Sequence, residues 1–414
     1  MVPDPRCGRA AKHDLAEILV CLVCGFLAGK TTIRRSLKWC KRHLGELKKH
    51  LILKNGIASP STVSRVLSGI DEELFALEFM EWIGEIVSTK GIHLAIDGKA
   101  LRAAMEKVKN FRTPMVLNAI DAVTGLVAAQ LPIKDKGCEI TAIPELLKLL
   151  DIKGSTVTTD AIGTQTQIME QILSQEGHFV MQVKKNQPQA YGEIMKYFGE
   201  MSEDRKRMEK EKDYRPRHPE MQRKYEEISQ TERNRDRQEY RWYSVCTDCS
   251  LLSRTQEEWP FIKTAGMARQ VRIPVERDAE GNDITPDINS FLKKGSRRRP
   301  KPVRNEEMGE DIQETGMISD LELTAEEMGR IKREHWAVEN RLHHVLDDTF
   351  REDRSPAKRS KNNLALIRKF AYNILRIAIL LGSCTEIMTE AMDEFSDDPF
   401  LMKKYVFSGI DSLY

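Results

Sequence analysis

The chain has 414 residues, which is enough for about two to four domains and a sizeable hydrophobic core. Hydrophobic residues make up 40% of it, so the composition excludes a largely disordered chain. The formal net charge is only +2 although 31% of the residues are charged, so the placement of the charges says more about binding partners than their sum.

Two apolar stretches raise the question of a membrane span. The run over 15–27 is too short to cross a bilayer, and the run over 374–381 is interrupted by Arg376. Residues 1–14 carry charges and lack the apolar segment of a signal peptide. We therefore expect a cytoplasmic protein.

Two short motifs suggest functions that their context does not support. A zinc site from the CxxC pairs at 21–24 and 246–249 would join cysteines more than 200 positions apart, so core thiols are the better interpretation. The segment GFLAGKTT, from Gly25, resembles a P-loop, but three residues rather than four separate its glycines and no strand precedes it.

Residues 1–90 predict an all-helical domain. Asp14 can cap a first helix, and a second helix rich in Lys and Arg is expected over about 31–53. Ser59 and Pro60 form a typical helix start, and LFALEFMEWIGEIV continues the helical pattern. We expect this domain to bind DNA.

The segment SPSTVSRVL resembles the recognition helix of helix-turn-helix repressors. In that arrangement Thr62, Ser64 and Arg65 would face DNA, with the first helix on the backbone. An ordinary amphipathic helix is the slightly favoured alternative.

Residues 91–201 predict an α/β core. The expected elements are a strand over 93–101, two strands joined by a turn within 115–133, a helix over 139–151, a strand over 155–163, a helix over 166–177 and a strand over 178–185. Three strands in a meander followed by helix, strand, helix and strand is the order of a ribonuclease H-like core.

Residues 202–315 are expected to form a partly β insertion. Residues 202–241 are dense in both charge signs, and the strand-like segments YRWYSVCTD and AGMARQVRIPV follow. The basic segment 293–304 is broken by Gly and Pro, which predicts a flexible loop. Residues 316–414 then predict a long helix over 324–350 and a last helix over 363–381, which complete the core.

Three acids have positions that suggest catalysis. Asp97 lies in the first strand of the core and Asp160 ends the fourth strand. These strands are neighbours in a ribonuclease H-like sheet, so the two carboxylates should meet at one edge, and Glu339 lies on a helix that can pack against that sheet. Converging carboxylates suit hard cations such as Mg²⁺, and two such ions roughly 4 Å apart support in-line phosphoryl transfer. For each acid taken alone, a turn residue or a solvated helix face is the common alternative.

The motifs that carry these acids resemble those of the DDE transposases of bacterial insertion sequences, in the group that contains the H-repeat-associated proteins. The matching segments are AIDGKALR at 95–102, the stretch from KDKGCEITAIPELL through TTDAIGTQTQI at 134–168, VKKNQ at 183–187, REHWAVENRLHHVLDDTFRED at 333–353 and NLALIRKFAYNILR at 363–376. The resemblance covers nearly the whole chain and extends to the N-terminal helices.

The resemblance implies that Asp97, Asp160 and Glu339 form the catalytic, metal-binding triad, with two Mg²⁺ ions for which Mn²⁺ can substitute. It also implies DNA as the partner, both as terminal inverted repeats and as target, a homodimer or larger assembly on DNA, and a place at the bacterial nucleoid. Further residues expected to contact DNA are Lys99, Arg102, Lys185, Arg237, His335, Asn340, Arg341 and His343.

The chain departs from the family pattern at two places. A His-Gly-Arg-like turn is replaced by Arg235, Asp236 and Arg237. Around Glu339 the Tyr-Arg-Glu-Lys signature of related transposases is not met, because His335 and Leu346 occupy the Arg and Lys positions. The sequence therefore leaves open which side chains near the third acid bind phosphate. Two other functions also remain open: a ribonuclease H-like nuclease without strand transfer, and a non-catalytic DNA-binding protein derived from a transposase.

Overall fold

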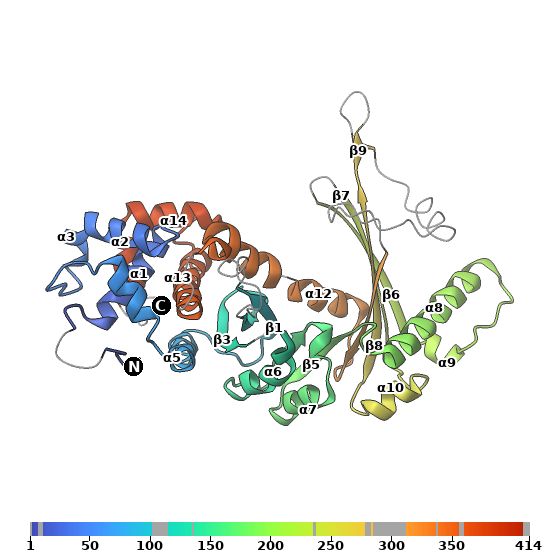
Figure 1. The fold of residues 1–414 in the computed structure, drawn as a ribbon. Helices are drawn as coiled ribbons and strands as arrows, with labels where there is room; N and C mark the ends of the chain where they lie inside the picture. Colours follow the sequence, from blue (N-terminus) through green and yellow to red (C-terminus); the bar gives the residue numbers. More distant parts are fainter. Residues whose placement is uncertain are drawn as a thin grey trace, which may run out of the picture. The chain divides into compact units, whose positions relative to one another are not determined.

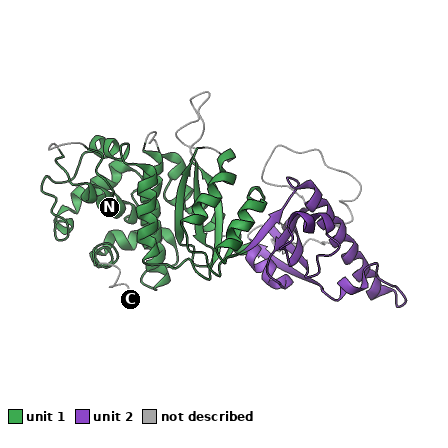
Figure 2. Cartoon of the chain, turned by 90° about the horizontal axis from the view of Figure 1, so that it is seen from below, with its two compact units in different colours: residues 1–178, 333–414 green, residues 179–332 purple. Residues whose placement is uncertain are grey.

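The computed structural model describes residues 2–6, 11–101, 115–134, 136–234, 237–277, 283–284, 312–336, 338–355 and 360–408. The chain divides into two compact units, drawn in green and purple in Figure 2. Unit 1 comprises Met1–His178 and Arg333–Tyr414, and unit 2 comprises Phe179–Lys332. Each unit contains strands and helices of its own.

The N-terminal part of unit 1 is helical, as predicted (Figure 1). Its helices are α1 (Leu15–Leu27), α2 (Ile33–Arg42), α3 (Leu44–Leu47), α4 (Pro60–Leu67) and α5 (Glu72–Gly84). Asp14 caps α1 by accepting the Glu17 amide, and Ser59 caps α4 by accepting the Thr62 amide. The single helix predicted over 31–53 is wrong, because His43 leaves helical geometry and its ring Nδ1 lies 3.0 Å from the Trp39 carbonyl oxygen.

The C-terminal helices pack against these N-terminal helices. They are α13 (Lys361–Leu380), α14 (Met388–Asp397), α15 (Pro399–Met402) and a π-helical turn at Lys403–Phe407. Helix α13 contacts α1, α5 and β3, and its Phe370 ring packs on Phe75, Phe79 and Trp82 of α5. The end of the chain therefore stabilises the first domain as well as the sheet.

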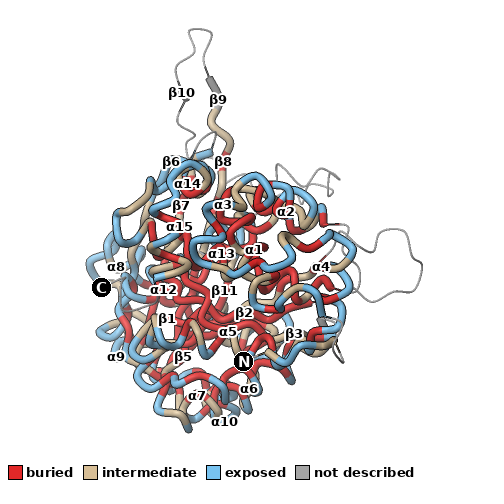
Figure 3. Tube along the Cα trace, turned by 90° about the vertical axis from the view of Figure 1, so that its left-hand side faces the viewer, coloured by how far each residue is buried: buried red, intermediate tan, exposed pale blue. Residues whose placement is uncertain are grey.

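The sheet of unit 1 contains β1 (His93–Ala100), β2 (Met115–Asp121), β3 (Val127–Ile133) and β4 (Thr156–Thr159), in the order β3-β2-β1-β4. Strands β1 and β2 are antiparallel, whereas β1 and β4 are parallel with Ile96 opposite Thr159. The first half of β1 is buried, at 0–1% exposure for residues 94–96 (red in Figure 3). Helices α6 (Glu139–Lys148) and α7 (Thr166–Ser174) follow β3 and β4, so the predicted ribonuclease H-like order is confirmed.

Unit 2 is an antiparallel sheet with helices. Its strands are β5 (His178–Val183), β11 (Gln313–Ser319), β8 (Thr264–Pro274), β7 (Arg237–Cys246) and β6 (Tyr225–Asn234), in that order. Its helices are α8 (Pro188–Lys210), α9 (Pro219–Gln222), α10 (Ser253–Glu258) and the first two turns of α12 (Ala325–His335). A separate pair, β9 (Glu276–Arg277) and β10 (Asp283–Ile284), is antiparallel. The sequence predicted β5, β7 and β8 but missed α8, β6 and β11.

The long helix predicted over 324–350 is interrupted. Helix α12 ends at His335, and π-helical segments follow at Val338–His343 and Val345–Thr349 before a 3₁₀ turn at Glu352–Arg354. A π-helix widens the backbone turn and frequently occurs at functional sites. The basic segment 293–304 lies outside the described residues. Within the described part of the chain, no helix is both long and apolar enough to cross a membrane.

Candidate active site

Two of the three predicted acids lie side by side at the edge of the unit 1 sheet. Asp97 is in β1, and Asp160 directly follows β4 as the N-cap residue of a 3₁₀ turn. Because Ile96 pairs with Thr159 in parallel register, the next residue on each strand reaches the same level. Glu339 is the second residue of the first π-helical segment, four residues after α12 ends.

Four side chains interact at this point. One ligand atom each from Asp97, Glu339 and His343 lies within 4.8 Å of the others. The His343 Nδ1 lies 3.0 Å from a Glu339 carboxylate oxygen and 3.6 Å from an Asp97 carboxylate oxygen. Burial raises the pKa of Asp97 to about 6; the negative charges of Asp160 and Glu339 add to the rise, and His343 and the Gly98 amide oppose it. Asp160 therefore belongs to the same electrostatic cluster.

His343 is a site residue whose position the sequence did not reveal. Its side chain is 6% exposed, whereas that of Glu339 is 64% exposed, so the histidine lies beneath the carboxylate. Contact with the carboxylate oxygen requires a proton on Nδ1, which leaves Nε2 as a buried nitrogen without a partner among the described residues. The ring thus fixes the direction of the third acid and is too buried for the DNA contact expected of it.

Gly98, next to the first acid, allows the Glu139 carboxylate to pack closely against β1. A Cβ at position 98 would lie 2.2 Å from Oε1 of Glu139, which is the first residue of α6 and only 6% exposed. Any larger residue would displace either the strand or that glutamate. The close approach of Glu139 is therefore the physical reason for glycine at this position.

Lys99 connects the strand of the first acid to the segment of the third. Its Nζ lies 2.6 Å from Asp347 and 3.8 Å from Glu352, and it donates to the His343 carbonyl at 3.5 Å. The lysine side chain is 5% exposed and that of Glu352 is 1% exposed. Buried charges of this kind hold a geometry only while they remain paired. Lys99 is consequently a structural bridge, and its position does not suit direct contact with phosphate.

His335 also lies inside the fold. Its Nδ1 is 2.9 Å from the Thr158 hydroxyl, which is also 2.9 Å from Nε2 of His93. The other ring nitrogen of His93 lies 2.8 Å from Glu334. This network joins β1, β4 and the end of α12 under the acids, so His335 is placed to anchor the segment that carries Glu339 rather than to contact DNA.

The remaining predicted DNA contacts are dispersed. Asn340 and Arg341 are exposed beside the acids, and Arg341 donates to the carbonyls of Ala122 and Val123, the latter at 2.5 Å. In unit 2, Lys185 and Arg237 are exposed. On α4, Ser64 and Arg65 are exposed and Thr62 is half-buried, while Arg102 lies outside the described residues.

Burial also characterises the cysteines of the CxxC pairs and two of the tryptophans. All four CxxC cysteines are buried, and the one group of three metal-ligating side chains in the described part of the chain is the acid and histidine set above. Among the tryptophans, Trp259 is 1% exposed and cannot stack on DNA bases, whereas Trp336, three residues before the third acid, is 44% exposed.

The sequence of this chain matches the sequences of known transposases. Residues 88–374 match the family described as the transposase DDE domain, and residues 1–83 match the family described as DDE_Tnp_1-associated. The Escherichia coli K12 protein "H repeat-associated putative transposase YhhI" is 31% identical over 379 residues, which is 91% of this chain and 88% of that protein. A second protein of that strain, "H repeat-associated putative transposase YbfD", is 35% identical over 202 residues, covering 48% of this chain and 78% of its own length.

Among solved structures, a piggyBac transposase synaptic complex with hairpin DNA is similar over 99% of this chain and 77% of the transposase chain. The TM-score is 0.39 and the sequence identity 11%, a similarity too weak to carry an argument.

Proposed function

The chain belongs to the transposase DDE domain family, and from this we propose that it is a DNA transposase that cleaves the ends of an insertion sequence and joins them to target DNA. The observation that supports the proposal is the closeness of Asp97 in β1 and Glu339 in the π-helical segment, with Asp160 at the matching level of the neighbouring strand β4. A set of carboxylate ligands suits direct attack by water and then by a 3′-hydroxyl.

The donor set fits a divalent cation. Asp97, Asp160 and Glu339 supply carboxylate oxygens, the ligands that Mg²⁺ and Mn²⁺ prefer. Burial raises the pKa of Asp97, and the like charges of Asp160 and Glu339 add to the rise, so a bound cation would favour the ionised carboxylate. When bound, a pair of such ions activates the attacking oxygen and stabilises the leaving oxygen. His343 orients the Glu339 carboxylate, and Lys99 keeps β1 at a fixed distance from the π-helical turns.

The proposed partners are the terminal inverted repeats of the element and its target DNA. A transposase must hold two ends at once, so we expect a homodimer or a larger assembly on DNA, at the bacterial nucleoid in the cytoplasm. The exposed Asn340 and Arg341, beside the acids, are proposed to contact the DNA backbone near the scissile phosphate.

The decisive experiment compares Asp97→Asn with the unmodified chain on labelled duplexes that carry the terminal repeats, read from the DNA flanking the gene. The substitution keeps the size of the side chain but removes a charge that holds the metal, so nicking and joining should fall at least about 100-fold in Mg²⁺ or Mn²⁺. Binding in a gel shift should stay within about threefold, because it depends on cations elsewhere. Asp348→Asn, at an exposed acid paired with His344, is the matched control and should remain active.

The outcomes separate three functions. Nicking followed by joining supports a transposase, whereas nicking without joined product supports a nuclease with the same triad. Duplex binding by the unmodified chain without any nicking supports a non-catalytic DNA-binding protein. Unchanged nicking by the Asn variant would refute the role of Asp97.

A further inference from the structure

Helix α2 has one strongly basic face. Its ten residues, IRRSLKWCKR, include five cations and no acid. At about 100° per residue, these five fall within an arc of about 120°, while the four buried residues occupy the opposite side. The exposed cations are Arg34, Arg35, Lys38, Lys41 and Arg42. We call this set the α2 basic face.

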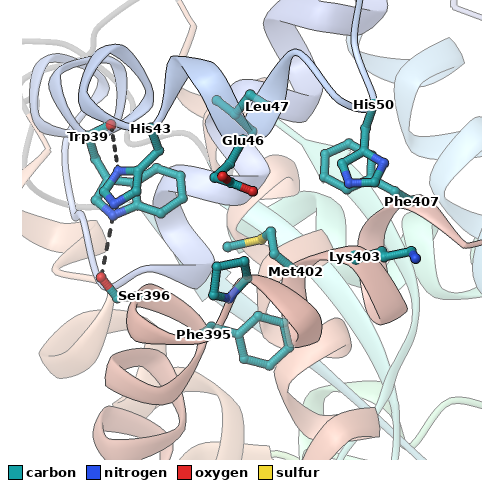
Figure 4. A pocket seen from close by; sticks show the side chains of 11 residues that line it. Trp39, His43, Glu46, Leu47, His50, Phe395, Ser396, Met402, Lys403 and Phe407 are labelled. Atoms are coloured by element: carbon teal, nitrogen blue, oxygen red, sulfur yellow. Dashed lines mark hydrogen bonds between the residues drawn. The ribbon is translucent and has the colours of Figure 1, made fainter.

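The opposite side of α2 is fixed in the fold. Figure 4 shows Trp39 stacked on His43, with its indole nitrogen donating to Ser396 of α14 at 3.3 Å. The thiol of Cys40 donates to the Cys21 carbonyl of α1 at 3.1 Å. A Cβ at Gly25 would lie 2.3 Å from that of Ser36, so α1 and α2 approach closely. Helix α2 is therefore held rigidly with its cations outward.

These cations have no intramolecular explanation. Among the described residues, no carboxylate lies within 4.0 Å of any of the five, and Glu46, the one acid between residues 30 and 54, pairs with Lys49. Several of the cations stand three or four positions apart, as Arg34, Lys38 and Lys41 do, and such like-charge neighbours destabilise a helix. Because these cations repel one another on the helix, we expect an anion outside the chain to bind them.

We propose that the α2 basic face binds the phosphate backbone of duplex DNA and is the main DNA contact of the N-terminal helices. Arg34 to Arg42 span about 12 Å along the helix, enough for about three successive phosphates of one strand. The alternative helix, α4, exposes only Arg65 as a cation. It is also separated from α2 by α3 and residues 48–59, so the short turn of a helix-turn-helix is missing.

The inference rests on the proposed function in that DNA is the substrate, and the test keeps the two apart. The full chain is assayed for binding a labelled 40-base-pair duplex of arbitrary sequence over a range of salt concentrations. Replacing Arg34, Lys38 and Lys41 by Gln preserves helix propensity and should lower the log–log salt slope by about 2–3. At about 0.1 M salt the dissociation constant should rise at least about 50-fold.

Two control variants complete the design. Replacing Lys90, Lys148 and Lys153 by Gln changes the net charge equally at exposed lysines that pair with carboxylates, and it should move the dissociation constant by less than about threefold. The charge-preserving set of Arg34→Lys, Lys38→Arg and Lys41→Arg should retain binding. Circular dichroism of each variant establishes that the helices are intact.

Equal binding by the α2 Gln variant and the lysine control would overturn the inference while leaving cleavage of terminal-repeat DNA, and with it the proposed function, in place. Equal affinity of the unmodified chain for single-stranded DNA of the same length would overturn the assignment to duplex. If the unmodified chain neither binds nor cleaves any duplex, both proposals fail together.

Discussion

Replacing Asp97 by Asn should make the metal-free protein more stable, although it removes a carboxylate proposed to hold the catalytic ion. The pKa of Asp97 is raised from its usual value of 3.8 to about 6 because the group is buried beside Asp160 and Glu339. A shift of about two units corresponds to about 3 kcal/mol, and since the side chain is 26% exposed we expect about 1–3 kcal/mol. Asn is neutral and avoids this cost.

The pH dependence follows from the sign of the shift. Below about pH 4 Asp97 is protonated in both the folded and the unfolded chain, so Asn gives no advantage. Between about pH 4 and 6 the carboxyl ionises in the unfolded chain first, and the stability of the unmodified protein falls as the pH rises. Above about pH 6 the loss is complete, and the melting temperature of the Asn variant should be higher by several degrees.

Thermal melts in EDTA at pH 4 to 8 measure this effect, with Asp348→Asn as a control at an exposed acid. Adding Mg²⁺ at about 100 times its dissociation constant should stabilise the unmodified protein by about 2.7 kcal/mol and the Asp97 variant hardly at all, so their order should reverse. A metal-free Asn variant that is less stable at pH 7, or a difference independent of pH, would refute the reasoning.

Two further substitutions test the supports of the site. His343→Ala removes the side chain that lies 3.0 Å from the Glu339 carboxylate. We therefore expect nicking to be about 10–100-fold slower, with duplex binding unchanged. A nicking rate equal to that of the unmodified chain would contradict the orienting role. Lys99→Met leaves Asp347 without its cation, whereas Glu352 keeps Arg368 at 3.9 Å. We therefore expect about 1.5–3 kcal/mol lower stability in urea unfolding, and a loss below about 1 kcal/mol would show that the bridge is dispensable.

The order of elements in the core was readable from the sequence because strands and helices have different hydrophobic periods. Short apolar segments that end in Asp97 and Asp160 predicted the two strands, and the ribonuclease H-like order placed them side by side as β1 and β4. Charged elements escaped the same reasoning. Strand β6 exposes most of its residues, and α8 carries charge on much of its surface, so neither shows a clear apolar period.

The direction of each polar side chain was decided by tertiary structure alone. Lys99, His335 and His343 are of residue types that often contact DNA, yet each is buried. Their partners come from other elements of the fold, such as Thr158 for His335. The sequence pattern of a single helix cannot predict these contacts between elements. The turn from α-helix to π-helix before Glu339 and the bond between Trp39 and Ser396, 357 positions apart, likewise depend on packing between segments distant in the sequence. Periodicity shows which face of a helix is buried, but only the fold determines what lies against it.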